Sequence, residues 1–273
     1  MQPLNLDHLD TFDFQPRTKT RSLGFGRRLY YAAGQPAFWL KTQVSTKSDS
    51  SISSPHAELG WQQELNFYQT HSRSSDLNFF LPHQIIQQPF TIQHEQFEQA
   101  LILVDAPAHF QIMPDQLSVT QIRQHLLQAV EPLLCLQQLG YLHADLKREH
   151  FVDAQGRVCL LDFEQVQALD QKVDELNATP RYMAPELFQG KAKSLQSEVY
   201  ALGVIFYEWL SGQRLQATDY LDWAFLHCQR LKVELPEQIQ IFEKLLALML
   251  GKQKQHRLAD FKAVKHYLVT EIE

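Results

Sequence analysis

The fold is decided by residues 140–165, which read GYLHADLKREHFVDAQGRVCLLDFEQ. The stretch starts where a helical pattern stops, contains Asp145, passes through a short hairpin and continues to Asp162. The two aspartates lie 17 positions apart, each directly after an apolar residue, so a hairpin can bring them to one place. One carboxylate can then hold a metal ion while the other accepts a proton. Phosphoryl transfer requires both of these functions.

The composition is that of a folded protein with a sizeable core. Of the 273 residues, 44% are hydrophobic and 21% are charged, which excludes a wholly disordered chain. This length allows one large domain or two lobes of roughly 100–150 residues each. The net charge of −6 gives no electrostatic reason to expect a nucleic-acid partner. The three cysteines are too few and too far apart for a disulfide framework or a zinc site.

No targeting or membrane-spanning segment is expected. The first residues, MQPLNLDHLDTFDF, lack the basic and apolar regions of a signal peptide. The apolar stretch Ile241–Leu250 is interrupted by Glu243 and Lys244 and is too short to cross a bilayer. We therefore expect a cytoplasmic protein without a membrane span.

Short strands dominate the first hundred residues. Two apolar and aromatic runs, Arg28–Ala32 and Ala37–Gln43, are joined by a turn that contains glycine and proline, which predicts a hairpin. The serine-rich stretch Thr46–Ser54 predicts a loop, and its last residue predicts the N-cap of a helix over 55–69. The nearly all-apolar run Gln99–Val104 predicts a buried strand.

From Ser118 onward the apolar residues recur with a helical period, and Gly140 is the expected end of the first long helix. Further helices are expected at Ser197–Leu210, Tyr220–Leu231, Ile239–Leu250 and Leu258–Val269. Because the predicted strands come first in the chain and the predicted helices follow, we expect an α+β fold with two lobes. We expect a single domain over 1–273: a small β-rich N-lobe with one helix (1–104), a hinge (105–114) and a larger, mostly helical C-lobe (115–273). The cleft between such lobes is the expected ligand site.

In this order, the segments resemble the motifs of the eukaryotic-like protein kinase family, in its serine/threonine branch. Residues 143–150, HADLKREH, resemble the catalytic loop H-R-D-L-K-x-x-N, and 162–164, DFE, resemble the metal-binding motif D-F-G. Residues 178–186, ATPRYMAPE, resemble the end of an activation segment, and 197–212 resemble the buried helix that follows it. The resemblance implies a bilobal kinase fold. It also implies an ion pair between Arg257 and Glu186.

By the same resemblance, the N-lobe carries the elements that bind ATP. Gly24 and Gly26 match a glycine-rich phosphate loop that lacks its third glycine, and Lys41 matches the lysine that holds the α- and β-phosphates. This lysine needs a carboxylate from the following helix, for which Glu58 and Glu64 compete. We choose Glu64 because it lies in mid-helix above an apolar face. Glu58 lies in the first turn, where acidic residues commonly complement the helix dipole.

The adenine of ATP is expected at the hinge, where Asp105 and Ala106 follow the apolar strand. If Val104 closes the back of the pocket, the backbone donor falls on Pro107, which has no N–H. With the register shifted by one residue, the donor is Ala106. The sequence leaves this register open.

Four positions depart from the family pattern. Ala144 replaces the arginine that binds a phosphorylated residue of the activation segment, so this control is expected to be missing. His150 replaces an asparagine that helps to hold the second metal, and its imidazole either coordinates a divalent ion or packs in the core. A similar histidine occurs in the kinase-like enzymes that phosphorylate lipopolysaccharide sugars. Glu164 replaces the D-F-G glycine and adds a negative charge, and Glu198 replaces the aspartate that braces the catalytic loop.

The residues that transfer requires are nevertheless in place. The resemblance assigns the proton of the substrate hydroxyl to Asp145. It assigns Lys147 and Thr179 to the γ-phosphate and the catalytic aspartate, and Asp162 to Mg²⁺ or Mn²⁺, for which His150 is the candidate second ligand. We therefore expect an active, ATP-dependent protein serine/threonine kinase with a protein substrate.

Two alternatives belong to other classes. A pseudokinase, which signals by shape alone, is favoured by His150, Glu164 and the missing third glycine. A small-molecule or lipopolysaccharide-sugar kinase is favoured by His150 and the short phosphate loop, whereas the segment Met183–Glu186 argues against it because this region usually forms a platform for a peptide.

Overall fold

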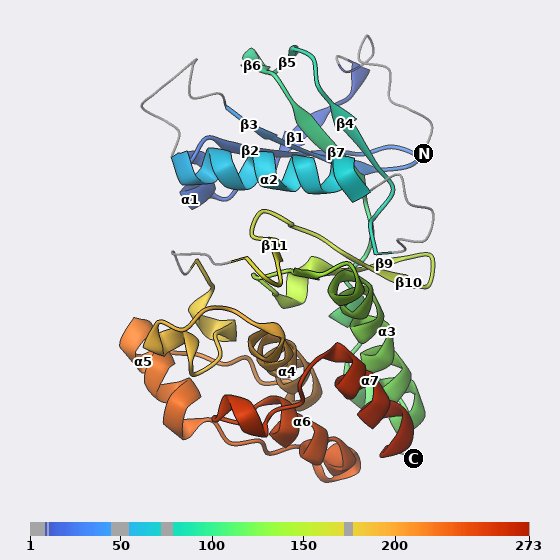
Figure 1. The fold of residues 1–273 in the computed structure, drawn as a ribbon. Helices are drawn as coiled ribbons and strands as arrows, with labels where there is room; N and C mark the ends of the chain where they lie inside the picture. Colours follow the sequence, from blue (N-terminus) through green and yellow to red (C-terminus); the bar gives the residue numbers. More distant parts are fainter. Residues whose placement is uncertain (1–8, 10, 45–54, 72–78, 172–176, 273) are drawn as a thin grey trace. The chain divides into compact units, whose positions relative to one another are not determined.

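The computed structural model describes residues 9, 11–44, 55–71, 79–171 and 177–272. They form two compact units. The first runs to Ala106 and also holds Asp162–Glu164, and the second comprises Pro107–Leu161 and Gln165–Glu273. The first holds most of the strands and the second most of the helices, which confirms the predicted α+β class (Figure 1). The loop expected at Thr46–Ser54, with its capping serine, lies outside the described residues.

The first unit is built on one antiparallel sheet. Its elements are β1 (Phe14–Pro16), α1 (Thr20–Leu23), β2 (Arg27–Ala32), β3 (Phe38–Gln43), α2 (Pro55–His71), β4 (His83–Ile86), β5 (Phe90–Ile92), β6 (Glu95–Phe97) and β7 (Ala100–Val104). The sheet has the order β1-β2-β3-β7-β4, and β5 pairs with β6. The predicted hairpin and the predicted buried strand are confirmed as β2–β3 and β7. The sequence interpretation did not include β1 or the strands β4 to β6.

The centre of this sheet positions Lys41. In β3, Lys41 lies opposite Leu29 of β2 and Leu101 of β7. Because side chains alternate along a strand, the neighbouring Leu40 enters the hydrophobic core, where it is fully buried. Lys41 therefore extends from the opposite face of the sheet.

Aromatic packing holds Asp162–Glu164 against α2. The helix buries Trp61, Leu65 and Tyr68, which share one face because they are spaced by four and three residues. The ring of Phe163 lies 5.0 Å from that of Phe67 and 5.4 Å from that of Tyr68, between ring centroids. Packing of this kind fixes the two flanking carboxylates, Asp162 and Glu164, beside the helix.

The second unit is mainly helical. Its principal elements are α3 (Val119–Gln138), β8 (Tyr141–Leu142), β9 (Phe151–Ala154), β10 (Arg157–Leu160), β11 (Gln167–Ala168), α4 (Leu195–Ser211), α5 (Tyr220–Phe225), α6 (Glu243–Met249) and α7 (Phe261–Thr270). Two short antiparallel pairs, β9–β10 and β8–β11, accompany the helices. Helix α4 is buried from Ser197 to Leu210, as expected for a helix that is apolar on all sides. Helix α3 packs against α7, and α4 packs against α6.

The helix boundaries follow local capping chemistry. Helix α3 starts after Ser118, close to the predicted start, and the hydroxyl of Ser118 accepts a hydrogen bond from the backbone N–H of Gln121. The predicted start of the last helix at Leu258 is wrong: Asp260 caps α7 by accepting from the N–H of Ala263. The helix predicted over 220–231 is α-helical only to Phe225, after which a π-helical turn follows.

Within the described residues, no helix combines the length and the apolar composition that crossing a bilayer demands.

Candidate active site

Two groups of candidate residues occur, one in each unit. In the first unit, Lys41 is surrounded by three carboxylates. Its ammonium Nζ lies 2.6 Å from Oε2 of Glu64, 3.2 Å from Oδ1 of Asp162 and 2.5 Å from Oε1 of Glu164. Of the two glutamates that competed for Lys41 in the sequence, the structure thus brings Glu64 to it. Glu64 also accepts the backbone N–H of Phe163 at 3.1 Å, which links α2 to residues 162–164.

The charges of this group depend on one another. Burial acts against the ammonium of Lys41, but Asp162, Glu164 and Glu64 outweigh it and raise the pKa of Lys41. Burial raises the pKa of Glu64, and the charge of Lys41 opposes this effect. Lys41 is therefore firmly protonated, and it neutralises carboxylates that would otherwise repel one another.

Glu164 also holds a second cation. Its Oε1 lies 2.5 Å from a guanidinium nitrogen of Arg27, the first residue of β2. Arg27 directly follows Gly26, which has a left-handed backbone with φ of +79° that glycine adopts at little cost. Gly24 ends the short helix α1. The two glycines thus form the turn that brings Arg27 beside Glu164.

The three carboxylates offer a set of oxygen ligands. Glu64, Asp162 and Glu164 each place one ligand oxygen within 4.8 Å of the others. Hard oxygen donors of this kind fit Mg²⁺ or Mn²⁺. Asp162 is the most accessible of them, since its side chain is 34% exposed, against 12% for Glu164 and 1% for Glu64. Asp162 also has a left-handed backbone, with φ of +68°.

At the predicted hinge, the structure uses the backbone of Asp105 within the sheet. Its N–H donates to the carbonyl of Ala37 at 2.9 Å, and its carboxylate accepts from Nε1 of Trp39 at 2.7 Å. The amide of Asp105 is therefore engaged by the chain itself, and a role of Asp105 and Ala106 in binding adenine stays a prediction.

In the second unit, Asp145 is the centre of the candidate group. Nζ of Lys147 lies 2.6 Å from Oδ2 of Asp145, and the hydroxyl of Thr179 donates to Oδ1 at 2.9 Å. The three predicted catalytic side chains are thus in direct contact. Each oxygen of Asp145 has a different partner, which fixes the orientation of the carboxylate.

A buried carboxylate, that of Glu198, binds the backbone of the loop that carries Asp145. Glu198 of α4 accepts the backbone N–H of Ala144 at 2.5 Å and that of His143 at 2.9 Å. Burial raises the pKa of Glu198, which the charge of His143 and the two backbone hydrogen bonds oppose. The extra methylene of glutamate is thus compatible with bracing the loop.

His150 lies in the core of the second unit. The residue is buried, and its ring stacks on that of His143 with 5.3 Å between the centroids. Its backbone N–H donates to the carbonyl of Lys147 at 3.1 Å. A role of His150 as a metal ligand stays a prediction.

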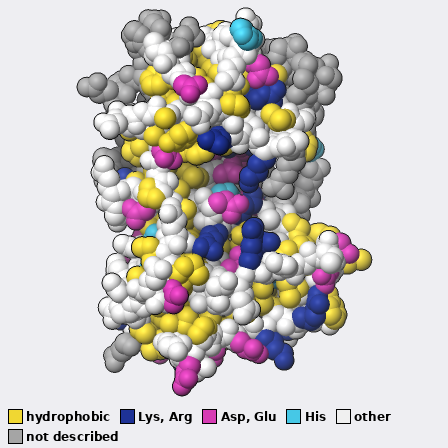
Figure 2. Space-filling model, turned by 180° about the vertical axis from the view of Figure 1, so that it is seen from behind, with side chains coloured by type: hydrophobic (Ala, Val, Ile, Leu, Met, Phe, Trp, Pro, Cys, Tyr) yellow, Lys and Arg dark blue, Asp and Glu magenta, His cyan; other side chains and the backbone are white. Residues whose placement is uncertain are grey.

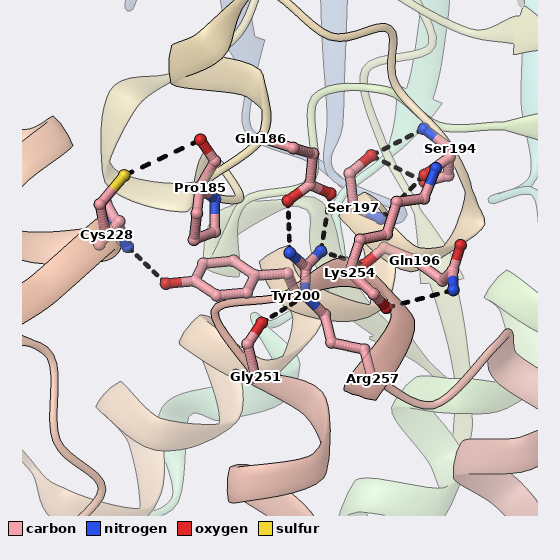
Figure 3. A network of polar contacts seen from close by, with 11 residues as sticks. Pro185, Glu186, Ser194, Gln196, Ser197, Tyr200, Cys228, Gly251, Lys254 and Arg257 are labelled. Atoms are coloured by element: carbon pink, nitrogen blue, oxygen red, sulfur yellow. Dashed lines mark hydrogen bonds and ion pairs between the residues drawn. The ribbon is translucent and has the colours of Figure 1, made fainter.

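A third polar network joins Glu186 to Arg257, two residues of the second unit that are distant in sequence (Figure 3). Arg257 binds both carboxylate oxygens of Glu186, and Nε donates to the carbonyl of Gly251 at 2.6 Å. The guanidinium also lies 5.1 Å from the ring centroid of Tyr200. The predicted ion pair is therefore confirmed, and it is bidentate.

Two basic residues near these groups were not identified from the sequence. Arg27 contacts Glu164, and the ammonium of Lys193 contacts the backbone beside Asp145. Arg27 follows Gly26 directly, and this adjacency is the one signal that could have indicated it. Lys193 belongs to no motif.

Charges of both signs mix on the molecular surface. On the face drawn in Figure 2, lysine and arginine side chains lie among aspartate and glutamate side chains.

Comparison with known proteins places these motifs in a family. The sequence pattern of the protein kinase domain matches residues 85–269. The chain is 30% identical to the cAMP-dependent protein kinase catalytic subunit PRKX of Mus musculus over 132 residues, which are 45% of this chain and 37% of that protein. It is 34% identical to a cGMP-dependent protein kinase of Toxoplasma gondii over 97 residues, or 35% and 10% of the two proteins.

A plant relative matches over a longer part of the chain. The serine/threonine-protein kinase TIO of Arabidopsis thaliana is 28% identical over 171 residues, which are 60% of this chain and 13% of that protein. The matches thus cover between 10% and 37% of the length of these three relatives.

Proposed function

Because the chain belongs to the protein kinase family, we propose that it is an active, ATP- and metal-dependent protein serine/threonine kinase located in the cytoplasm. The observation that carries the proposal is the position of Asp145, whose two carboxylate oxygens are held by Lys147 and Thr179. A chain that only signals by shape has no chemical need for this triple contact.

The first unit would bind the nucleotide. Lys41, oriented by Glu64, supplies the positive charge for the α- and β-phosphates, and Gly24 and Gly26 form the turn beside them. Asp162 would be the main metal ligand, and a bound Mg²⁺ or Mn²⁺ would neutralise charge on the phosphate oxygens.

The second unit would act on the acceptor. Asp145 accepts or orients the proton of the substrate hydroxyl. Lys147 and Thr179 hold its carboxylate in one orientation, as this role requires. Lys147 neutralises the transferring phosphoryl group. Positioning and electrostatic stabilisation, without a covalent intermediate, would account for the rate.

The pseudokinase alternative is favoured by one observation. Glu164 lies 2.5 Å from Lys41 and so competes with nucleotide phosphates for the same ammonium. A sugar kinase is the third possibility, favoured by His150. Incubation of the purified chain with γ-labelled ATP, a generic protein substrate and sugar acceptors separates the three. We expect label in protein; label in sugar alone, or in neither acceptor, would contradict the proposal.

Activity should not depend on phosphorylation of the activation segment. Between Asp162 and Glu186 the only hydroxyl side chains in the sequence are those of Thr179 and Tyr182. The hydroxyl of Thr179 donates to Asp145, and Tyr182 is buried. We expect phosphatase treatment to leave the rate of transfer unchanged. A large drop after treatment would show that the chain needs a phosphate there after all.

His150 should set the preference between metal ions. Manganese accepts imidazole ligands more readily than magnesium does, so we expect more activity with Mn²⁺ than with Mg²⁺. His150→Asn should shift the ratio of the two activities towards Mg²⁺, whereas His266→Asn, at an exposed position of α7, should leave it unchanged. An unaltered ratio in His150→Asn would show that the imidazole only packs against His143.

A further inference from the structure

Lys193 connects two segments of the second unit that are distant in sequence. It lies in the loop before α4, and its side chain is partly buried. The ammonium donates to the backbone carbonyl of Ala144 at 2.5 Å and also to the backbone carbonyl of Asn177. One side chain therefore joins the residue before Asp145 to the segment that leads into Thr179.

The backbone at Ala144 has a conformation that its surroundings must stabilise. Its φ is +66°, in the left-handed region that residues with a Cβ rarely adopt. Such a conformation persists only where the surrounding structure fixes it. Here the N–H of Ala144 is bound by Glu198 and its carbonyl by Lys193, so charged side chains hold both polar groups of the residue.

The environment of Lys193 is partly buried and lies close to acidic side chains. Burial lowers the pKa of Lys193, although the charges of Asp145 and Glu198 favour its protonated form. A cavity of about 30 Å³ adjoins it, lined among others by Asp145 and Thr179, and has room for about one water molecule. A slightly larger cation can therefore be accommodated at the same place.

We propose that Lys193 is a positioning residue that holds the activation segment against the catalytic loop, so that this chain needs no phosphate for that contact. In the family pattern this ordering uses an arginine at position 144, and Ala144 offers no cation. Lys193 supplies a positive charge from another loop and binds carbonyl oxygens. The catalytic consequence rests on the proposed kinase function, whereas the structural link does not.

The test compares three variants of the full chain. Lys193→Met removes the charge and keeps the length of the side chain, and Lys193→Arg restores a cation. Lys191→Met is the matched control, because Lys191 lies in the same loop and is exposed. We measure hydrogen exchange of the amides in Asn177–Met183, and the kcat and KM for ATP.

In Lys193→Met we expect exchange in this segment to be about tenfold faster or more, because hydrogen bonds from charged groups stabilise local structure strongly. The kcat should fall while the KM for ATP stays unchanged. Lys193→Arg and Lys191→Met should behave like the wild type. Unchanged exchange in Lys193→Met would overturn the proposal.

Two further outcomes are also decisive. If the wild type transfers no phosphate, the proposed function fails, but exchange still tests the link made by Lys193. If Lys193→Met does not fold, a folded Lys193→Arg supports the proposal, because the cation alone then restores the contact. If neither Lys193→Met nor Lys193→Arg folds, the proposal is contradicted, because the fold would then require the shape of lysine and not only its charge.

Discussion

Replacing Asp145 with asparagine should reduce the rate of phosphoryl transfer by about 100- to 10,000-fold, the range that a positioned general base contributes. The amide cannot accept the proton of the substrate hydroxyl. Its contacts with Lys147 and Thr179 would also lose the negative charge that now orients them. The affinity for ATP should change little, because the proposed phosphate ligand Lys41 is held by Glu64, Asp162 and Glu164 within the first unit.

The control is Asp115→Asn, which makes the same chemical change at an exposed position of the second unit. Initial rates and nucleotide binding are measured on the same preparations of both variants. A turnover in Asp145→Asn close to that of the wild type would remove Asp145 from the mechanism.

The largest effect on stability is expected at Arg257. Its side chain is fully buried and binds both oxygens of Glu186 (Figure 3). In Arg257→Leu the carboxylate of Glu186 would be left buried without its counter-charge, which typically costs about 3–5 kcal/mol of unfolding free energy. For a chain of this size, that corresponds to a fall in Tm of roughly 6–20 °C.

An exposed ion pair provides the comparison. Arg230 and Asp222 form a similar pair at the surface, with a 48% exposed arginine side chain. Arg230→Leu should leave the Tm nearly unchanged, because exposed ion pairs contribute little to stability. The double variant Arg257→Leu/Glu186→Leu should regain part of the stability lost in Arg257→Leu, because it leaves no unpaired charge. Thermal unfolding that shows the same Tm for Arg257→Leu and Arg230→Leu would contradict this account.

Motifs with fixed spacing allowed much of the candidate site to be predicted. The contact of Asp145 with Lys147 lies within one loop, so the sequence itself sets the distance. The pairs of Lys41 with Glu64 and of Glu186 with Arg257 are distant in sequence, and the family pattern indicated them. Each of these two pairs joins a basic and an acidic side chain, so the charges also favoured the pairing.

Contacts outside motifs could not be predicted in this way. Lys193 binds backbone carbonyls, which every residue has, so no partner side chain marks its role in the sequence. Glu164 could be recognised as a departure, but its link to Arg27 depends on the turn at Gly26. The strands β4 to β6 have only three or four residues each, too few to show a clear apolar alternation, and pairing with neighbouring strands stabilises them more than local preference does.

The helical boundaries differ for a related reason. The apolar period continues across a helix end, whereas the end itself is fixed by one capping side chain such as Asp260. The π-helical turn after Phe225 keeps the apolar pattern of a helix, so the period alone could not show where the α-helix ends.

Phosphoamino-acid analysis after incubation with γ-labelled ATP tests the central claim most directly. The wild type and Asp145→Asn are each incubated with Mg²⁺ or Mn²⁺ and a protein substrate, and the labelled protein is hydrolysed to its amino acids. We expect labelled phosphoserine or phosphothreonine with the wild type and little or none with Asp145→Asn. No labelled amino acid with a wild-type chain that binds ATP would contradict it, and so would equal labelling by the two proteins.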